Sequence, residues 1–374
     1  MVHNLIINLI NISMTKPTFK HFLRSSLLVL QCSFTVVGTV VGAGFASGKE
    51  IASFLGIYNS YFLFACIFFC LLFGCGLYLC FFTKRITLNK ITQKVSFAGI
   101  FICNFISFTA MLSAIDSSIK MASTCQIWYF LCLILIYLVI VFGVNGLNKC
   151  NLVLVPALFF ILLFMGYLGL KNNDILNTVS LKANSLNLVT SVPMYMGLNL
   201  YGVYPVATEL SPMLSKKQQM GVSFLSSLLI LLLLLCAGVT VLNASTNAIC
   251  ADLPLLFYAA EKHSFMFIPC VLTLTIAIIT TNCANGFILV SQVKDKVKHK
   301  NLFLLVLFAV CLPLSKFGFS NIVKYIYPIS GAIGINMLTL IFAEALRALF
   351  LEKKKHKQLN NSTQNKPTVN QQSN

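Results

Sequence analysis

Charged residues are scarce in this chain, and their scarcity excludes a soluble globular protein. Asp, Glu, Lys and Arg together make up 10% of the 374 residues, whereas hydrophobic residues make up 58% and the mean hydropathy is +0.87. A soluble domain carries about 25% charged residues. Long polar segments are also lacking, since the longest one between apolar stretches, 244–264, is too short to bury a core. The composition predicts a membrane protein without a separate soluble domain.

Histidine is also rare, and the five histidines offer no metal or catalytic site. They lie in the termini or between apolar stretches, without zinc-ligand spacing or a neighbouring nucleophile. The 14 cysteines lie mostly inside apolar stretches, where they act as small hydrophobic residues. Residues 1–14 lack the basic region and cleavage site of a secretory signal, and translation starts at Met1 or Met14. We expect neither an enzyme nor a bound cofactor.

Ten apolar stretches are each long enough to cross a bilayer as a helix, which takes about 20 residues. They lie at 27–56, 60–82, 96–119, 126–146, 150–170, 187–210, 219–243, 265–292, 300–315 and 325–350. The sequence therefore predicts an all-α membrane domain over 27–350. A cytoplasmic segment, 1–26, precedes it, and a basic, polar tail, 351–374, follows it and is predicted to be disordered.

The 27 Lys and Arg residues are distributed unevenly between the two ends of these stretches. Most collect at the ends that face one side; the exceptions are Lys120, Lys171, Lys182, Lys262, Lys316, Lys324 and Lys49 within the first stretch. Because Lys and Arg accumulate in cytoplasmic loops, both termini are predicted to be cytoplasmic, with the chain in the inner (plasma) membrane. The net charge of +18 is then a topology signal, and nucleic acid is not expected as a partner.

The first apolar stretch contains GTVVGAGFASGKE, residues 38–50, for which three interpretations compete. A dinucleotide-binding loop needs a preceding strand and a βαβ unit, which this apolar context excludes. Small residues spaced by four allow close packing of two membrane helices. The third interpretation is an interrupted helix, in which backbone groups near 42–44 turn toward a central cavity. Lys49 and Glu50 favour the interrupted helix, because charged side chains within a span are costly unless they face a water-filled cavity or a partner.

A second stretch, 187–210, carries Pro193, Gly197, Gly202 and Pro205, five stretches further along the chain. Paired interruptions at corresponding positions of two halves are typical of transporters built from inverted repeats, with a binding site at the membrane midplane. We therefore predict ten transmembrane helices arranged as a 5+5 inverted repeat, with helices 1 and 6 broken.

Residues 27–350 resemble the YkvI-type membrane proteins, and the most specific part of this resemblance is the string VGAGFASGKEI. The ten spans with two breaks resemble the leucine-transporter fold of the amino acid, polyamine and organocation transporter superfamily. This resemblance implies a secondary transporter that works by alternating access on a small organic solute, such as an amino acid or a related zwitterion. The expected partners are that solute and the lipid bilayer.

Sodium is the coupling ion that the resemblance implies. In sodium-coupled members, a G-x-x-V-G-x-G segment of span one and an A-x-x-[TS]-[TS] segment of span eight hold the ion, and oxygen ligands suit a small hard cation. The corresponding residues here are Gly38, Val41, Ala277, Thr280 and Thr281. Alternatively, the two threonines bond to carbonyls of their own helix. Phe45 replaces the Asn of a second sodium site, and no Lys lies within 151–170, where proton-coupled or uncoupled relatives have one.

The same resemblance implies a substrate site between the two breaks. Its residues are Gly42, Ala43, Gly44, Phe45, Tyr195, Gly197, Asn199, Tyr201 and Gly202, with backbone amides meeting a substrate carboxylate. Lys49, Glu50 and Asp116 are candidate gate or coupling residues, and a simple ion pair with Lys120 is the alternative for Asp116. Two other functions stay open: a proton-coupled carrier, and a ligand sensor that does not transport.

Overall fold

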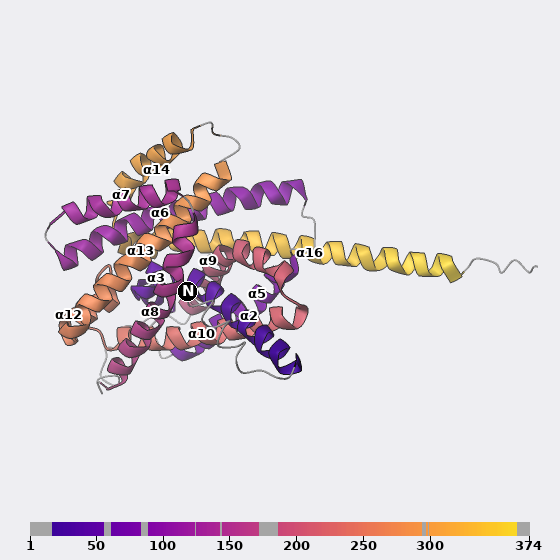
Figure 1. Ribbon diagram of the computed structural model, residues 1–374, viewed down its shortest axis with the longest axis horizontal. Helices are drawn as coiled ribbons and strands as arrows, with labels where there is room; N and C mark the ends of the chain where they lie inside the picture. Colours follow the sequence, from indigo (N-terminus) through magenta and orange to yellow (C-terminus); the bar gives the residue numbers. More distant parts are fainter. Residues whose placement is uncertain are drawn as a thin grey trace, which may run out of the picture.

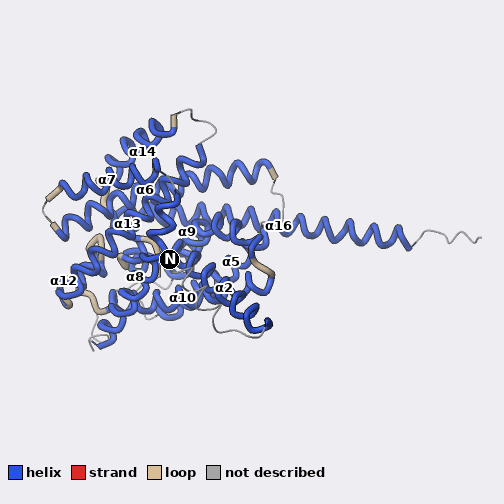
Figure 2. Tube along the Cα trace, in the orientation of Figure 1, coloured by secondary structure: helices blue, strands red, loops and turns tan. Residues whose placement is uncertain are grey.

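The computed structural model describes residues 17–55, 61–83, 89–123, 125–142, 144–171, 186–293, 297 and 299–364. Within these ranges every regular element is a helix and no strand is present (Figure 2). Residues 1–16 with Met14, and residues 365–374 of the predicted tail, lie outside the described ranges.

The helices follow one another along the chain with short connections. Their bounds are α2 Pro17–Val40, α3 Ala43–Ala46, α4 Lys49–Phe54, α5 Phe62–Thr83, α6 Lys90–Ala122, α7 Ile127–Phe142, α8 Val144–Lys171, α9 Leu186–Leu210, η2 Ser211–Met213, α10 Lys216–Leu242, α11 Thr246–Cys250, α12 Pro254–Lys262, α13 Ser264–Val293, α14 Lys300–Ser315, α15 Phe319–Asn321, η3 Ile322–Ile326 and α16 Tyr327–Gln364. The element η3 is one turn of π-helix.

Several of these helices are built to lie in a bilayer. Five are long and apolar enough to cross it: Phe62–Thr83, Lys90–Ala122, Lys216–Leu242, Ser264–Val293 and Phe319–Ala348. Shorter apolar helices cover Arg24–Val40, Ile127–Val141, Pro156–Lys171 and Lys300–Ser315. Large apolar side chains face outward, and Phe64, Phe160 and Phe224 are 65%, 69% and 71% exposed. So much exposed apolar surface marks a membrane protein, as the composition predicts.

Local sequence signals set several helix ends. Ser215 caps α10 by accepting a hydrogen bond from the Gln218 amide, and the Gln218 side chain accepts one from the Ser215 amide. This capping box satisfies two amide groups that would otherwise have no partner. Pro254 occupies the first turn of α12, where a missing amide hydrogen costs nothing.

The helix α9 differs from the predicted broken helix 6. It runs without interruption from Leu186 to Leu210 and contains both Pro193 and Pro205. Gly197 of α9 instead allows close packing of two helices, because a Cβ on it would lie 2.5 Å from the Gly331 carbonyl oxygen of α16. This is the small-residue packing of membrane helices. The predicted break in the sixth span is therefore wrong, and backbone contact with α16 explains why a glycine lies there.

Residues 351–364 also differ from the prediction. We expected disorder from 351, but α16 continues as helix to Gln364 and projects away from the other helices (Figure 1). Leu, Glu, Lys and Gln are strong helix formers, so a helix that begins in the packed region propagates through them.

Candidate functional site

The first predicted span is interrupted near its middle. The helix α2 ends at Val40 and α3 begins at Ala43, while Gly42 between them is extended, with φ −81° and ψ −173°. The Gly42 amide donates to the Val40 carbonyl oxygen at 2.8 Å instead of continuing the helical ladder. Val41 and Ala43 are both buried. Such backbone is tolerated at membrane depth only inside protein or beside a polar cavity.

A second turn separates α3 from α4. Gly48 has φ +78°, a left-handed conformation that side chains rarely adopt. A Cβ there would also lie 2.9 Å from side-chain atoms of Val241 and Leu255. The Ser47 hydroxyl donates to the Gly44 carbonyl at 2.8 Å and so satisfies one backbone oxygen of this irregular segment.

The predicted sodium ligands are brought together in part. Thr281 of α13 faces the interruption, because a Cβ on Gly42 would lie 3.5 Å from its hydroxyl oxygen. Thr280 donates to the Ala277 carbonyl at 3.0 Å, the local bond expected if it serves only its own helix. Gly38 lies within α2, and Val41 directly precedes the extended Gly42. Thr281 therefore faces the interruption, whereas the hydroxyl group of Thr280 bonds to a carbonyl of its own helix.

Glu50 is the charged residue that lies at the interruption. It is 7% exposed, and its Oε2 accepts a hydrogen bond from the Tyr195 hydroxyl at 3.2 Å. Its carboxyl group fills the space beside Gly44, where a Cβ would lie 2.5 Å from the carboxyl carbon. Gly44 is thus a glycine because the carboxyl group occupies the position of a side chain. Tyr327 of α16 interacts with both Glu50 and Ser107.

Tyr195 is held in place by aromatic rings. Its ring centroid lies 5.2 Å from that of Phe54 and 4.8 Å from that of Phe69. The Asn199 amide donates to the Tyr195 carbonyl at 2.9 Å, within the same helix. The Tyr195 hydroxyl therefore points at Glu50 from a rigid position on α9.

Lys49 turns away from Glu50. Its ammonium group donates to three backbone carbonyl oxygens at the end of α11: Ile249 at 3.2 Å, Cys250 at 3.2 Å and Ala251 at 2.8 Å. The side chain is 6% exposed. A cation at a helix C-terminus satisfies carbonyls that lack intrahelical partners. Lys49 thereby ties the interrupted first span to the segment between α10 and α12.

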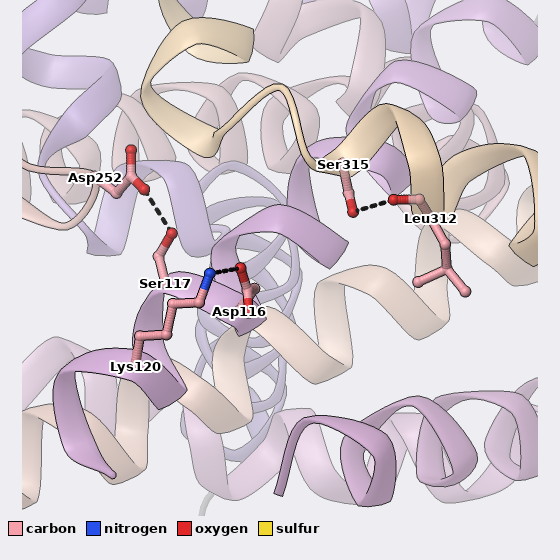
Figure 3. Close-up of polar contacts among 6 residues, drawn as sticks. All are labelled: Asp116, Ser117, Lys120, Asp252, Leu312 and Ser315. Carbon is pink, nitrogen blue, oxygen red and sulfur yellow. Dashed lines mark hydrogen bonds and ion pairs between the residues drawn. The ribbon is translucent and has the colours of Figure 1, made fainter. Parts of the chain in front are cut away.

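The same segment is held by two further helices. Asp252, which follows α11, accepts from the Ser117 hydroxyl of α6 at 2.6 Å (Figure 3) and from the Ser320 amide of α15 at 2.9 Å. Asp116 lies next to Ser117 but pairs with Lys120 at 2.5 Å, one turn along α6 (Figure 3). Both side chains are exposed, so the geometry of Asp116 is that of a local ion pair at the end of α6.

The other predicted substrate residues do not converge on the interruption. The Tyr201 hydroxyl donates to the Ser96 carbonyl of α6 at 2.7 Å. Gly202 is exposed, with no atom near the position of a Cβ, and Gly197 packs on α16. The predicted substrate residues that lie in or beside α3, α4 and one turn of α9 are Gly42–Phe45, Tyr195 and Asn199, and the gate candidate Glu50 lies beside them.

Sequence reasoning missed Tyr327, Ser107 and Asn282. Asn282 is fully buried next to Thr281, and both of its amide atoms lack a hydrogen-bond partner among the described residues. The sequence did contain a signal for Asn282, a polar side chain directly after two threonines within an apolar stretch. It was missed because the motif that was compared ends at Thr281. Tyr327 had no such signal, since only the packing of α16 brings it near Glu50.

A small apolar cavity adjoins the interruption. Its walls are Ala46 of α3, Leu158, Ile161, Leu162 and Met165 of α8, Leu255 and Leu256 of α12, and Cys270, Thr273 and Leu274 of α13. No cluster of three or more His, Cys, Asp or Glu side chains occurs in the described part of the chain.

No protein-family model matches the chain. It is 22% identical over 329 residues to the uncharacterized protein YyaD of Bacillus subtilis (strain 168). That match covers 82% of this chain and 94% of YyaD. The likeness extends along most of both proteins, but the name of that relative assigns no activity.

Proposed function

We propose that this protein is a secondary carrier that moves a small organic solute across the membrane by alternating access. One observation carries the proposal: the first span is interrupted at Val41–Gly42, in the protein interior, next to Thr281 and the Glu50–Tyr195 contact. Backbone that leaves the helix at that depth can offer its polar groups to a polar solute inside a membrane domain.

The packing of the helices supports a repeat of five spans. In such a repeat, α2–α4 would correspond to α9, α5 to α10, and α6 to α13. The helix α7 would correspond to α14, and α8 to η3 with α16. Each contact between halves should then occur twice with the partners exchanged. The helix α7 packs on α13, and its counterpart α14 packs on α6; α8 packs on α13, and its counterpart α16 packs on α6. Likewise α10 packs on α2, and α5 packs on α9.

Ten spans in two such halves would place the halves in opposite orientations, because each half crosses the membrane an odd number of times. Rotation of one set of spans against the other would then open the buried segment first to one side and then to the other. The proposed solute is an amino acid or a related zwitterion, which would contact Gly42–Phe45 and Tyr195.

Sodium remains a proposed coupling ion. Thr281 beside Gly42 favours it, since hydroxyl and carbonyl oxygens suit a small cation. A specific observation also favours the proton, because Glu50 is a buried carboxyl group beside the interruption.

Counterflow in proteoliposomes tests the proposal. Purified protein is screened by thermal shift with amino acids, with and without sodium, because a ligand that binds the folded state raises its stability. Vesicles loaded with the stabilising solute should then accumulate the labelled solute by exchange. Binding without exchange identifies a sensor and overturns the proposal, as does conductance without exchange.

A further inference from the structure

Glu50 of α4 lies against α9, and among the described residues no cationic side chain lies against its carboxyl group. The elements packed around α4 are α3, α9, α10 and η3. The titratable groups facing Glu50 from them are Tyr195 and, at the junction of η3 with α16, Tyr327, while Cys66 of α5 lies beside Tyr195. Residues of α3 and the end of α10 near Val241 carry no titratable side chain.

Basic residues near Glu50 point elsewhere. Lys49, its neighbour in sequence, gives its hydrogen bonds to the three carbonyls at the end of α11. The Lys324 ammonium lies over the Tyr325 ring, 5.1 Å from its centroid. Among the described residues, the acidic and basic side chains that form an ion pair are Asp116 and Lys120, at the end of α6. In the part of the chain that the structure describes, Glu50 is therefore buried among hydroxyl and aromatic groups without a paired cation.

A buried carboxylate without a paired cation is expensive, and the cost is greatest within a membrane domain. The carboxyl group is nevertheless accommodated, since Gly44 leaves room for it and the Tyr195 hydroxyl bonds to it. A proton on Glu50 reconciles the two facts. The protonated group has one oxygen that accepts from Tyr195 and one that carries hydrogen.

We propose that Glu50 carries a proton that is exchanged once in each transport cycle, so that the proton is a coupling ion of this carrier. This inference rests on the proposed function and extends it. In the closed arrangement the carboxyl group holds its proton. When α4 and α9 separate, water reaches Glu50, the O–H bond breaks, and the proton passes to water as hydronium. Closure of the two helices on the other side of the cycle requires the carboxylate to take up a proton again.

Tyr195 acts here as a positioning residue. Its hydroxyl joins α9 to α4 only while the two helices are together, so it links the state of Glu50 to the closure of the site. Rings of Phe54 and Phe69 keep it in that position.

Infrared difference spectroscopy of the full chain in lipid vesicles, titrated from acid to alkaline pH, tests this inference without a solute. A carbonyl-stretching band of a protonated carboxyl group should disappear reversibly as the pH rises and shift in deuterium oxide. Glu50→Gln should remove the band, whereas Asp116→Asn, the control at an exposed ion pair, should retain it. Tyr195→Phe should shift the band, since it removes the hydrogen bond to the carboxyl oxygen.

Two results would overturn the inference: a band that Glu50→Gln leaves in place, or a Glu50 band of constant intensity at every pH. If Glu50→Gln does not fold, the shift in Tyr195→Phe decides alone. The readout is independent of counterflow. Solute exchange with a pH-insensitive Glu50 would refute this inference alone, and an absence of exchange with a titrating Glu50 would refute the carrier alone.

Discussion

The first and the sixth predicted spans carry similar sequence signals and fold differently. Both contain glycines at helix-breaking positions, and the sixth adds Pro193 and Pro205. Yet the first is divided into α2, α3 and α4, whereas the sixth is the single helix α9. What decides between the two outcomes is what packs against each segment, because the same residues permit both a break and a close helix contact.

The helix α9 packs closely on α16. Gly197 of α9 and Gly331 and Gly334 of α16 lie where the two backbones approach each other, so that a Cβ there would meet backbone atoms of the other helix. The corresponding partner of the first span, α8, has few contacts with α2, and the apolar cavity lies between α8 and α3. The interrupted segment is held instead by polar contacts from Ser47 and Lys49. The α9 side of the site is thus held by close helix packing. The side formed by α3 and α4 is held by hydrogen bonds and adjoins the apolar cavity.

The largest effect is expected where α9 touches α16. In Gly197→Ala the new methyl group would lie 2.5 Å from the Gly331 carbonyl oxygen, and a backbone atom cannot move aside as a side chain can. We expect the free energy of unfolding to fall by about 3 kcal/mol, the upper end of overpacking costs. Thermal unfolding in lipid vesicles measures this. Gly42→Ala is the matched control, because its methyl group would lie 3.5 Å from Thr281 and should be tolerated. Equal losses would contradict the contrast between the two spans.

Lys49→Met should have the next largest effect, on the hydrogen-bonded side of the site. The substitution supplies an unbranched apolar side chain in place of the ammonium group, and it leaves the three carbonyls at the end of α11 without their donor. We expect the free energy of unfolding to fall by about 2 kcal/mol, as for hydrogen bonds to a charged group. Lys120→Met, at an exposed pair, should cost less than about 0.5 kcal/mol. Proteolysis of the 244–264 segment should also accelerate in the first variant, and an unchanged rate would show that Lys49 does not hold it.

Gly44→Ala should have a smaller effect on stability and a large one on transport. A methyl group would lie 2.5 Å from the Glu50 carboxyl carbon, and the flexible carboxyl group would swing away from Tyr195. We expect a loss of about 1 kcal/mol in the free energy of unfolding and loss of counterflow. Gly202→Ala, at a position with open space, is the control and should retain both. Full exchange by Gly44→Ala would separate Glu50 from the transport cycle.

Ala46→Val should have the smallest effect, and of opposite sign. The added methyl groups enter the apolar cavity between α3 and α8, and filling a cavity stabilises by about 0.5 kcal/mol or more. Because the cavity is the loosely packed side of the site, solute exchange should become slower while binding is retained. An unchanged exchange rate would show that this cavity takes no part in the motion.

Composition and hydropathy predicted the membrane class and the helical content, because both follow from burial of apolar side chains in a bilayer. The interruption at Gly42 was predictable from glycines combined with two charges in one span. The path of α9 was not, since Pro193 and Gly197 fit a break or a packed helix equally well until α16 is placed. Likewise, the contacts of Lys49 with α11 and of Tyr327 with Glu50 join segments far apart in sequence, which no local pattern encodes.

A density map of the full chain in lipid nanodiscs, determined with the solute found by thermal shift, tests the central claim most directly. We predict that the first helix ends at Val40 and resumes at Ala43, with solute density against Gly42–Phe45 and with Thr281 and the Glu50–Tyr195 contact beside it. A continuous first helix with Thr281 facing lipid, or solute bound away from this segment, would contradict the account.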